Sequence, residues 1–255
     1  MMQPKMNPAN RPRRPRPAPL ACDGLILVDK PSDWTSHDVV AKIRGRFHVK
    51  KVGHGGTLDP MATGLLVILL GRGTKMSDRV MGSDKTYEGV MELGKETDTH
   101  DVDGQVVAEH DASGVTEELL RKEVAARVGD IMQMPPMVSA IKKDGVPLYK
   151  LARKGQTVER EARLRHIYEF TILEAQLPEA RFRVQCTKGT YVRTLCHDLG
   201  HDLGCGAHLK ALRRTRSGGF KVEDALPLQD IVAMTPEEFV ASTISLHRLA
   251  AELLP

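Results

Sequence analysis

The stretch from Gly53 to Gly64 reads Gly-His-Gly-Gly-Thr-Leu-Asp-Pro-Met-Ala-Thr-Gly and holds the residues of this chain best suited to chemistry. Its glycines permit tight turns and the close approach of a ligand to the backbone. Pro60 disfavours a helical conformation at Asp59, so the carboxylate is presented from an extended or turn segment. One carboxylate aimed into a pocket suits nucleophilic or acid–base catalysis. The alternative is that Asp-Pro only begins a turn or a helix.

Two other chemistries are less well supported by the residue spacing. Neither this stretch nor the segment 71–75, Gly-Arg-Gly-Thr-Lys, has the spacing of a phosphate-binding P-loop. A metal site is the main rival, because five potential ligands lie within thirteen residues: Cys196, His197, His201, Cys205 and His208. Cys196 also fits the apolar face of a helix, and no second ligand pair has zinc-like spacing elsewhere. We therefore expect neither a metal nor a cofactor.

Length and composition predict a soluble protein of the cytoplasm. The 255 residues suffice for one large domain or two modest ones without disulfide support. The longest apolar run is the six residues 65–70, far short of the ~20 that span a membrane, and we expect no secretory signal. The four cysteines are expected to be reduced thiols.

The net charge of +4 comes from the N-terminal segment. Residues 1–20 hold five basic and no acidic residues, which leaves 32 basic against 33 acidic residues from 21 onward. Six prolines in the same twenty residues predict a disordered basic tail over 1–23. This tail is either an RNA-contacting arm or a solubilising segment or start-site artefact. Beyond it, 39–58 and 207–221 are basic and free of acids, and could bind a polyanion if they converge in space.

The elements that must position these residues mix strands and helices without regular alternation. Strands are predicted at 24–28, 85–93, about 164–175 and 180–187, and helices at 36–47, 116–129, 147–155 and 190–203. Ser36 is predicted to cap the first helix, and Thr235 to open a last helical region with a capping box. This order favours an α+β fold with an antiparallel or mixed sheet.

Eight segments, read together and in order, resemble the TruB family of tRNA pseudouridine synthases. They are GLILVDKP (24–31), GHGGTLDPMATG (53–64), GRGTK (71–75), SDKTYEG (83–89), ELGKETDT-D-DG (92–104), PPMVSAIKKDG (135–145), CTKGTYVRTLCHDLG (186–200) and LGCGAHLKALRRTRSG (203–218). The resemblance implies the pseudouridine synthase fold, with a mixed, largely antiparallel central sheet flanked by helices and loops. It further implies a catalytic domain over 24–232 and a helical extension over 233–255 without a full PUA domain.

The implied activity is isomerisation of uridine 55 in the tRNA T-loop to pseudouridine by base flipping, without cofactor or metal. The implied partner is the tRNA T-arm, bound by a monomer. A chaperone that binds and folds tRNA while keeping the synthase fold is the alternative.

The resemblance also assigns roles to single residues. Asp59 matches the catalytic aspartate, which either attacks the nucleotide covalently or abstracts the 2′ proton to give a glycal. Tyr87 matches the tyrosine that stacks on the flipped base and is a candidate base at C5, and Arg193 matches the arginine paired with the aspartate. Further matched substrate-site positions are His54, Tyr191, Leu212, Lys30, Lys75 and Asp101. Gly55 departs from the threonine that many bacterial members carry there, although eukaryotic relatives also show glycine.

Overall fold

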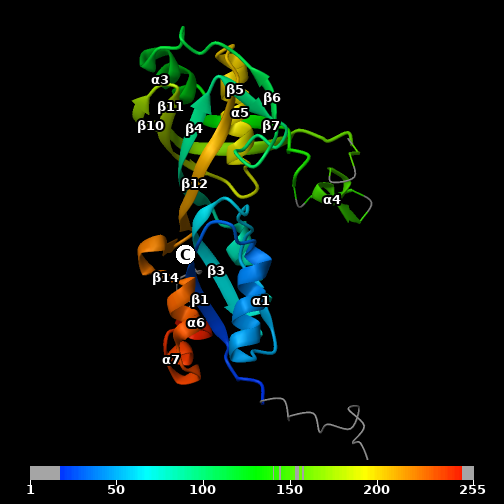
Figure 1. Ribbon diagram of the computed structural model, residues 1–255. Helices are drawn as coiled ribbons and strands as arrows, with labels where there is room; N and C mark the ends of the chain where they lie inside the picture. The colour runs from blue at the N-terminus through cyan, green and yellow to red at the C-terminus, as the bar shows by residue number, and fades with distance from the viewer. Residues whose placement is uncertain (1–17, 140, 144, 153–154, 157, 249–255) are drawn as a thin grey trace, which may run out of the picture.

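One mixed sheet of eleven strands organises the molecule (Figure 1). The computed structural model describes residues 18–248 apart from 140, 144, 153, 154 and 157. The sheet order is β14-β1-β3-β12-β4-β11-β10-β7, with β2, β13 and β15 paired beside β3, β12 and β1. The β1–β14 and β3–β12 pairs are parallel and the other pairs are antiparallel. The predicted mixed, largely antiparallel sheet and the α+β class are confirmed.

The strands of this sheet are β1 (Gly24–Lys30), β2 (Val52–His54), β3 (Thr63–Leu70), β4 (Lys85–Leu93), β7 (Gly129–Gln133), β10 (Arg163–Gln176), β11 (Glu179–Cys186), β12 (Ala207–Ser217), β13 (Phe220–Lys221), β14 (Leu226–Pro227) and β15 (Ile244–Ser245). Two small hairpins pair β5 (Lys95–Thr97) with β6 (Val106–Glu109), and β8 (Lys142–Lys143) with β9 (Val146–Pro147). The helices are α1 (Ser36–Phe47), α2 (Ser77–Gly82), α3 (Glu117–Ala125), α4 (Leu148–Ala152), α5 (Val192–Asp202), α6 (Leu228–Ala233) and α7 (Pro236–Ala241), with 3-10 turns η2 (Gly71–Met76) and η3 (Val222–Asp224).

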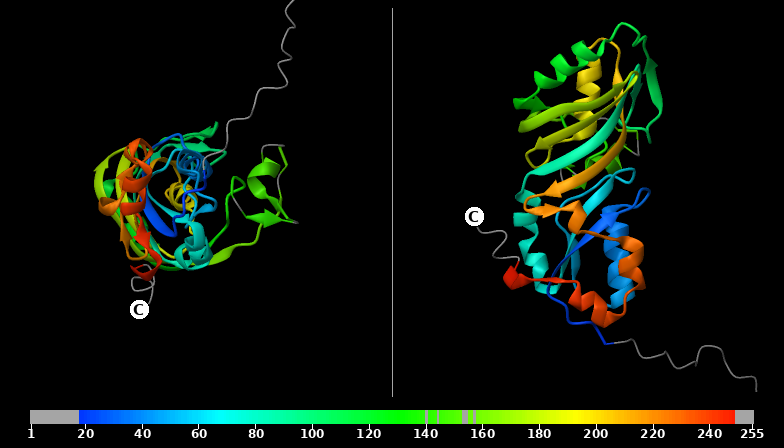
Figure 2. Two further views of the ribbon diagram at one scale, coloured as in Figure 1. Left: turned by 90° about the horizontal axis from the view of Figure 1, so that it is seen from below. Right: turned by 90° about the vertical axis from the view of Figure 1, so that its left-hand side faces the viewer.

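The strand β12 connects the two halves of the molecule (Figures 1 and 2). One half contains β1 and β3 with α1, α6 and α7, and the other contains β4, β11, β10 and β7 with α3 and α5. The segment carrying α4 projects away from the sheet. Because β12 pairs with β3 on one side and β4 on the other, it brings residues from both halves to one place.

The paired strands β1 and β3 are buried on both faces. On β1, Ile26 and Val28 join the main core cluster, while Leu25 and Leu27 join a second cluster on the opposite face. The same alternation holds along β3, where every residue from 65 to 70 is buried. A strand covered on both faces needs apolar residues at every position, which explains the unbroken apolar run.

The first helix begins differently from the sequence prediction. Thr35, not Ser36, is the N-cap of α1, and it forms a reciprocal capping box with Asp38. Ser36 is the first helical residue and is buried. Its hydroxyl bonds to the backbone of Leu58. The capping box predicted for the last helix is present, with Thr235 accepting from the backbone of Glu238.

Two sequence predictions concern the ends of the chain. Residues 1–17 of the predicted tail and 249–255 of the predicted extension lie outside the described residues. Within 18–23, Cys22 is buried and the carboxylate of Asp23 pairs with Arg72 at 2.6 Å. The four cysteines are free, buried thiols. No helix in the described ranges is long and apolar enough to cross a membrane.

Candidate functional site

The turn that carries Asp59 is held in place by side chains from two other elements. The backbone N–H of Leu58 donates to the hydroxyl of Ser36 at 2.8 Å, and that hydroxyl donates back to the Leu58 carbonyl at 3.2 Å. On the other side, the ammonium of Lys30 donates to the Pro60 carbonyl at 3.1 Å. The turn therefore has both its flanking residues fixed.

Lys30 is fully buried and supports this turn rather than lining the cavity beside Asp59. Its ammonium also donates to the carbonyls of Pro31 at 2.8 Å and Trp34 at 2.6 Å. Burial lowers the pKa of Lys30 to about 8, against smaller opposing effects of Asp33 and Asp59. Three carbonyl acceptors compensate for burying a charged amine.

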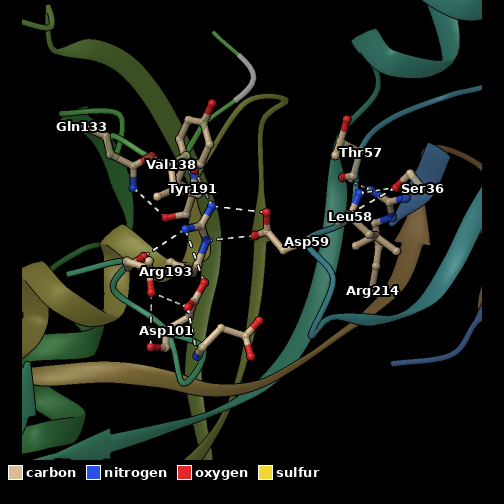
Figure 3. Close-up of polar contacts among 12 residues, drawn as sticks. Ser36, Thr57, Leu58, Asp59, Asp101, Gln133, Val138, Tyr191, Arg193 and Arg214 are labelled. Carbon is tan, nitrogen blue, oxygen red and sulfur yellow. Dashed lines mark hydrogen bonds and ion pairs between the residues drawn. The ribbon is translucent and has the colours of Figure 1, made fainter. Parts of the chain in front are cut away.

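Arg214 on β12 supports the same loop from the opposite end, and the sequence analysis did not single it out. Its side chain is only 2% exposed. The guanidinium donates to the carbonyls of Leu65 at 2.7 Å and Gly56 at 3.2 Å. It also donates to the carbonyl of Thr57 at 3.2 Å (Figure 3). A single buried cation thus fixes the loop just before Asp59 to the start of β3.

Asp59 and Arg193 form a two-pronged ion pair across the site (Figure 3). The Nε of Arg193 lies 2.9 Å from Oδ2 of Asp59, and a terminal nitrogen lies 3.2 Å from Oδ1. The Asp59 side chain is 35% exposed while Arg193 is 3% exposed. This geometry orients the carboxylate and leaves it open to the cavity.

The remaining donors of Arg193 are also used. They reach the carbonyls of Thr99 and Val138 at 2.9 Å each, and one lies 3.3 Å from the carboxylate of Asp101. Burial raises the pKa of Asp101, which the hydroxyl of Thr99 and the charge of Arg193 partly oppose. Arg193 is therefore held between an exposed and a buried carboxylate.

A cavity of about 270 Å³ opens beside Asp59. Tyr87 on β4, Leu212 on β12 and Tyr191 at the start of α5 all line it. The other lining residues are Gly56, Thr57, Leu58, Met81, Lys85, Ser139, Gly189, Thr190, Val192, Arg193 and Arg214. Burial raises the pKa of both tyrosines, so both are neutral phenols at neutral pH. A carboxylate beside two aromatic rings suits acid–base or nucleophilic chemistry on a flat heterocycle.

Gln133, another residue that the sequence analysis missed, positions Tyr191. Its side-chain amide donates to the Tyr191 carbonyl at 3.0 Å and accepts from the Tyr191 N–H at 2.8 Å. Gln133 is 2% exposed and stands at the end of β7. No sequence signal pointed to it, because its partner is 58 residues away.

The other predicted positions lie farther from the cavity. His54 on β2 is half-buried, accepts from the Gly56 N–H at 3.4 Å, and has its pKa lowered mainly by burial. Lys75 is exposed on η2 and does not line the cavity. Among the residues that the structure describes, no three His, Cys, Asp or Glu side chains gather as metal ligands would.

Gly55 owes its presence to packing rather than to an unusual backbone angle. A Cβ at this buried position would lie 2.2 Å from Cγ1 and 2.9 Å from Cβ of Val80. Gly55→Ala is therefore expected to destabilise the protein by about 1–3 kcal/mol through overpacking. Urea unfolding measures this loss, and a Gly55→Ala/Val80→Ala double variant should lose less than the two single losses added. An unchanged free energy of unfolding in Gly55→Ala would contradict the packing account.

Comparison with known proteins gives a consistent result. Residues 44–192 match the family profile described as TruB family pseudouridylate synthase, N terminal domain. Residues 193–255 match the tRNA pseudouridylate synthase B C-terminal domain. The tRNA pseudouridine synthase B of Opitutus terrae is 51% identical over 232 residues, which cover 91% of this chain and 96% of that protein. The protein of the same name from Syntrophotalea carbinolica is 50% identical, covering 85% of this chain and 71% of its own length.

Solved structures agree on the fold. The chain is similar, with a TM-score of 0.71 and 33% identity, to a protein in the crystal structure of a Cbf5-Nop10-Gar1 complex. It is also similar, with a TM-score of 0.68 and 30% identity, to a chain in an H/ACA RNP bound to a substrate RNA containing 2′-deoxyuridine. Each match covers 91% of this chain but only 62% of the solved chain.

Proposed function

The chain belongs to the TruB family of pseudouridylate synthases, and we propose that it converts uridine 55 in the T-loop of tRNA to pseudouridine, with Asp59 as the catalytic carboxylate. The observation that carries this proposal is the Asp59–Arg193 pair at the edge of a cavity walled by Tyr87, Tyr191 and Leu212. The relatives named tRNA pseudouridine synthase B support tRNA as the substrate.

The reaction needs little beyond what these side chains supply. The N1–C1′ bond of the uridine breaks, the uracil turns over, C5 bonds to C1′, and the C5 proton is lost while N1 gains one. Asp59 is the group that acts on the sugar, by attack at C1′ or by removing the 2′ proton, and Arg193 keeps its carboxylate oriented. No redox equivalent or energy source is consumed.

The cavity is suited to a base that has left its stack. Enzymes that act on a base extrude it into a pocket, where aromatic side chains replace the lost stacking. Tyr87 and Tyr191 offer such rings beside Asp59, and the Tyr87 oxygen, once it has lost its own proton, is also the candidate acceptor of the C5 proton. Because burial raises the pKa of Tyr87, formation of this phenolate depends on the neighbouring Arg214, whose charge and hydrogen bond lower that pKa.

The tRNA backbone would meet the exposed cations of the two acid-free segments. Four of the ten cations there have partners within the protein: Arg46, Lys210, Arg213 and Arg214. The other six are exposed: Lys42, Arg44, Lys50, Lys51, Arg216 and Lys221. Exposed cations gain most from phosphate contacts, since they give up no internal partner.

The proposal is tested with a transcript of the tRNA T-arm and chemical mapping of pseudouridine. We expect modification at uridine 55 and none in a matched transcript with cytidine at that position. Modification at a different uridine would contradict the assigned position, and the absence of any pseudouridine in either the T-arm or whole tRNA would contradict the activity.

A further inference from the structure

The loop between β5 and β6 holds one side of Arg193. The carbonyl of Thr99 and the carboxylate of Asp101 both contact its guanidinium, at 2.9 and 3.3 Å. The loop is tied to β12, because the Leu209 N–H donates to the His100 carbonyl at 3.0 Å and the Val102 N–H donates to the Leu209 carbonyl at 2.9 Å. His100 stands between the two residues that contact Arg193.

The backbone of His100 is in the left-handed conformation. Its φ is +64°, in the left-handed region that residues with a Cβ seldom adopt. Residues in that region persist where surrounding contacts determine their conformation.

The imidazole of His100 stacks on that of His197. The ring centroids are 3.9 Å apart and the planes differ by 6°. His197 lies on α5 four residues after Arg193, so the two side chains share one face of the helix. The Nδ1 of His197 is 3.9 Å from Oε2 of Glu96, beyond hydrogen-bond distance, so no hydrogen bond to that nitrogen competes with the ring stacking.

The stack is made with a neutral His100 ring. Burial, followed by the nearby His197 and Arg193, lowers the pKa of His100 to about 3. A neutral ring packs against its neighbour without adding a second positive charge beside Arg193. The His100 ring is therefore uncharged at neutral pH.

We propose that His100 and His197 are positioning residues for the isomerisation: their stack clamps the loop 97–101 to α5, so that Thr99 and Asp101 hold the Arg193 guanidinium in register with Asp59. The inference rests on the proposed function of Asp59 and Arg193. It concerns neither substrate contact nor proton transfer, because neither histidine lines the cavity beside Asp59.

The test uses the full chain, a T-arm transcript and single-turnover kinetics. His197→Ala is expected to lower the rate of pseudouridine formation by about 10- to 100-fold, since displacements of about 1 Å in a site have effects of this size. The Kd for the transcript should stay within twofold. His197→Phe keeps a flat ring, so its rate should stay within threefold of that of the original protein.

His100→Asn separates the ring from the backbone, because asparagine tolerates the left-handed conformation but cannot stack. It should slow the reaction as His197→Ala does, and combining the two should slow it no further. His201→Ala is the matched control on the next turn of α5, where the side chain is exposed, and should leave the rate unchanged.

The variants are compared at a temperature where unfolding curves show each to be folded. Unchanged rates in both His197→Ala and His100→Asn would overturn the positioning role, as would multiplying rate losses in the double variant. Failure of the original protein to form pseudouridine in the same transcript would instead overturn the proposed function.

Discussion

Asp59→Asn is expected to abolish pseudouridine formation while leaving tRNA affinity almost unchanged. The substitution keeps the size of the side chain and one acceptor oxygen, but removes the negative charge that pairs with Arg193 at 2.9 and 3.2 Å. A group that acts on the reacting atoms contributes about 10²–10⁴-fold to the rate, and more where it forms a covalent intermediate. Single-turnover assays on a T-arm transcript measure the loss.

The binding half of this prediction separates catalysis from folding. Asp59 is 35% exposed, and the loop around it is fixed by Ser36, Lys30 and Arg214 rather than by its own side chain. The Kd for tRNA should therefore change by less than about twofold to threefold. Residual turnover above about one hundredth of the original rate would exclude the assigned role.

The sequence predicted most elements whose side chains alternate or repeat regularly. The strand over 85–93 has its predicted bounds, and the helices at α1, α3 and α5 begin within two residues of the predicted positions. The central strand β12 was not predicted, although 207–221 was recognised as basic. Bulges after Leu209 and after Arg214 shift its alternation twice, so no period of two survives in the sequence.

Arg214 shows why the support of the site could not be predicted. Four cations within 207–217 resemble a solvated, RNA-facing strand, yet this one is buried. Three carbonyls make its burial favourable, one from β3 and two from the loop before Asp59, at separations of 149, 157 and 158 residues. Asp59 and Arg193 are 134 residues apart, and only the family motifs brought them together before the structure did.

Arg193→Met is expected to abolish the reaction and also to destabilise the protein by about 3–5 kcal/mol, because removing one partner of a buried ion pair leaves the other charge uncompensated. The carboxylate left buried without a partner is that of Asp101, whose side chain is 7% exposed, whereas Asp59 is more solvated. Arg193→Met/Asp101→Asn should therefore regain much of the lost free energy of unfolding, because asparagine can still accept from Thr99 without a buried charge.

The pH dependence of the free energy of unfolding tests this prediction most directly. Burial already raises the pKa of Asp101, and losing Arg193 removes an opposing charge and raises it further. A carboxyl with a raised pKa in the folded state makes the folded protein bind more protons than the unfolded one, so stability rises as pH falls toward the unfolded value of about 4. Urea unfolding between pH 8 and 5 should show Arg193→Met gaining stability on acidification, and the double variant losing that gain. Both variants should be inactive, since neither has a side chain that orients Asp59. Turnover in the double variant would mean that Arg193 serves only to neutralise Asp101.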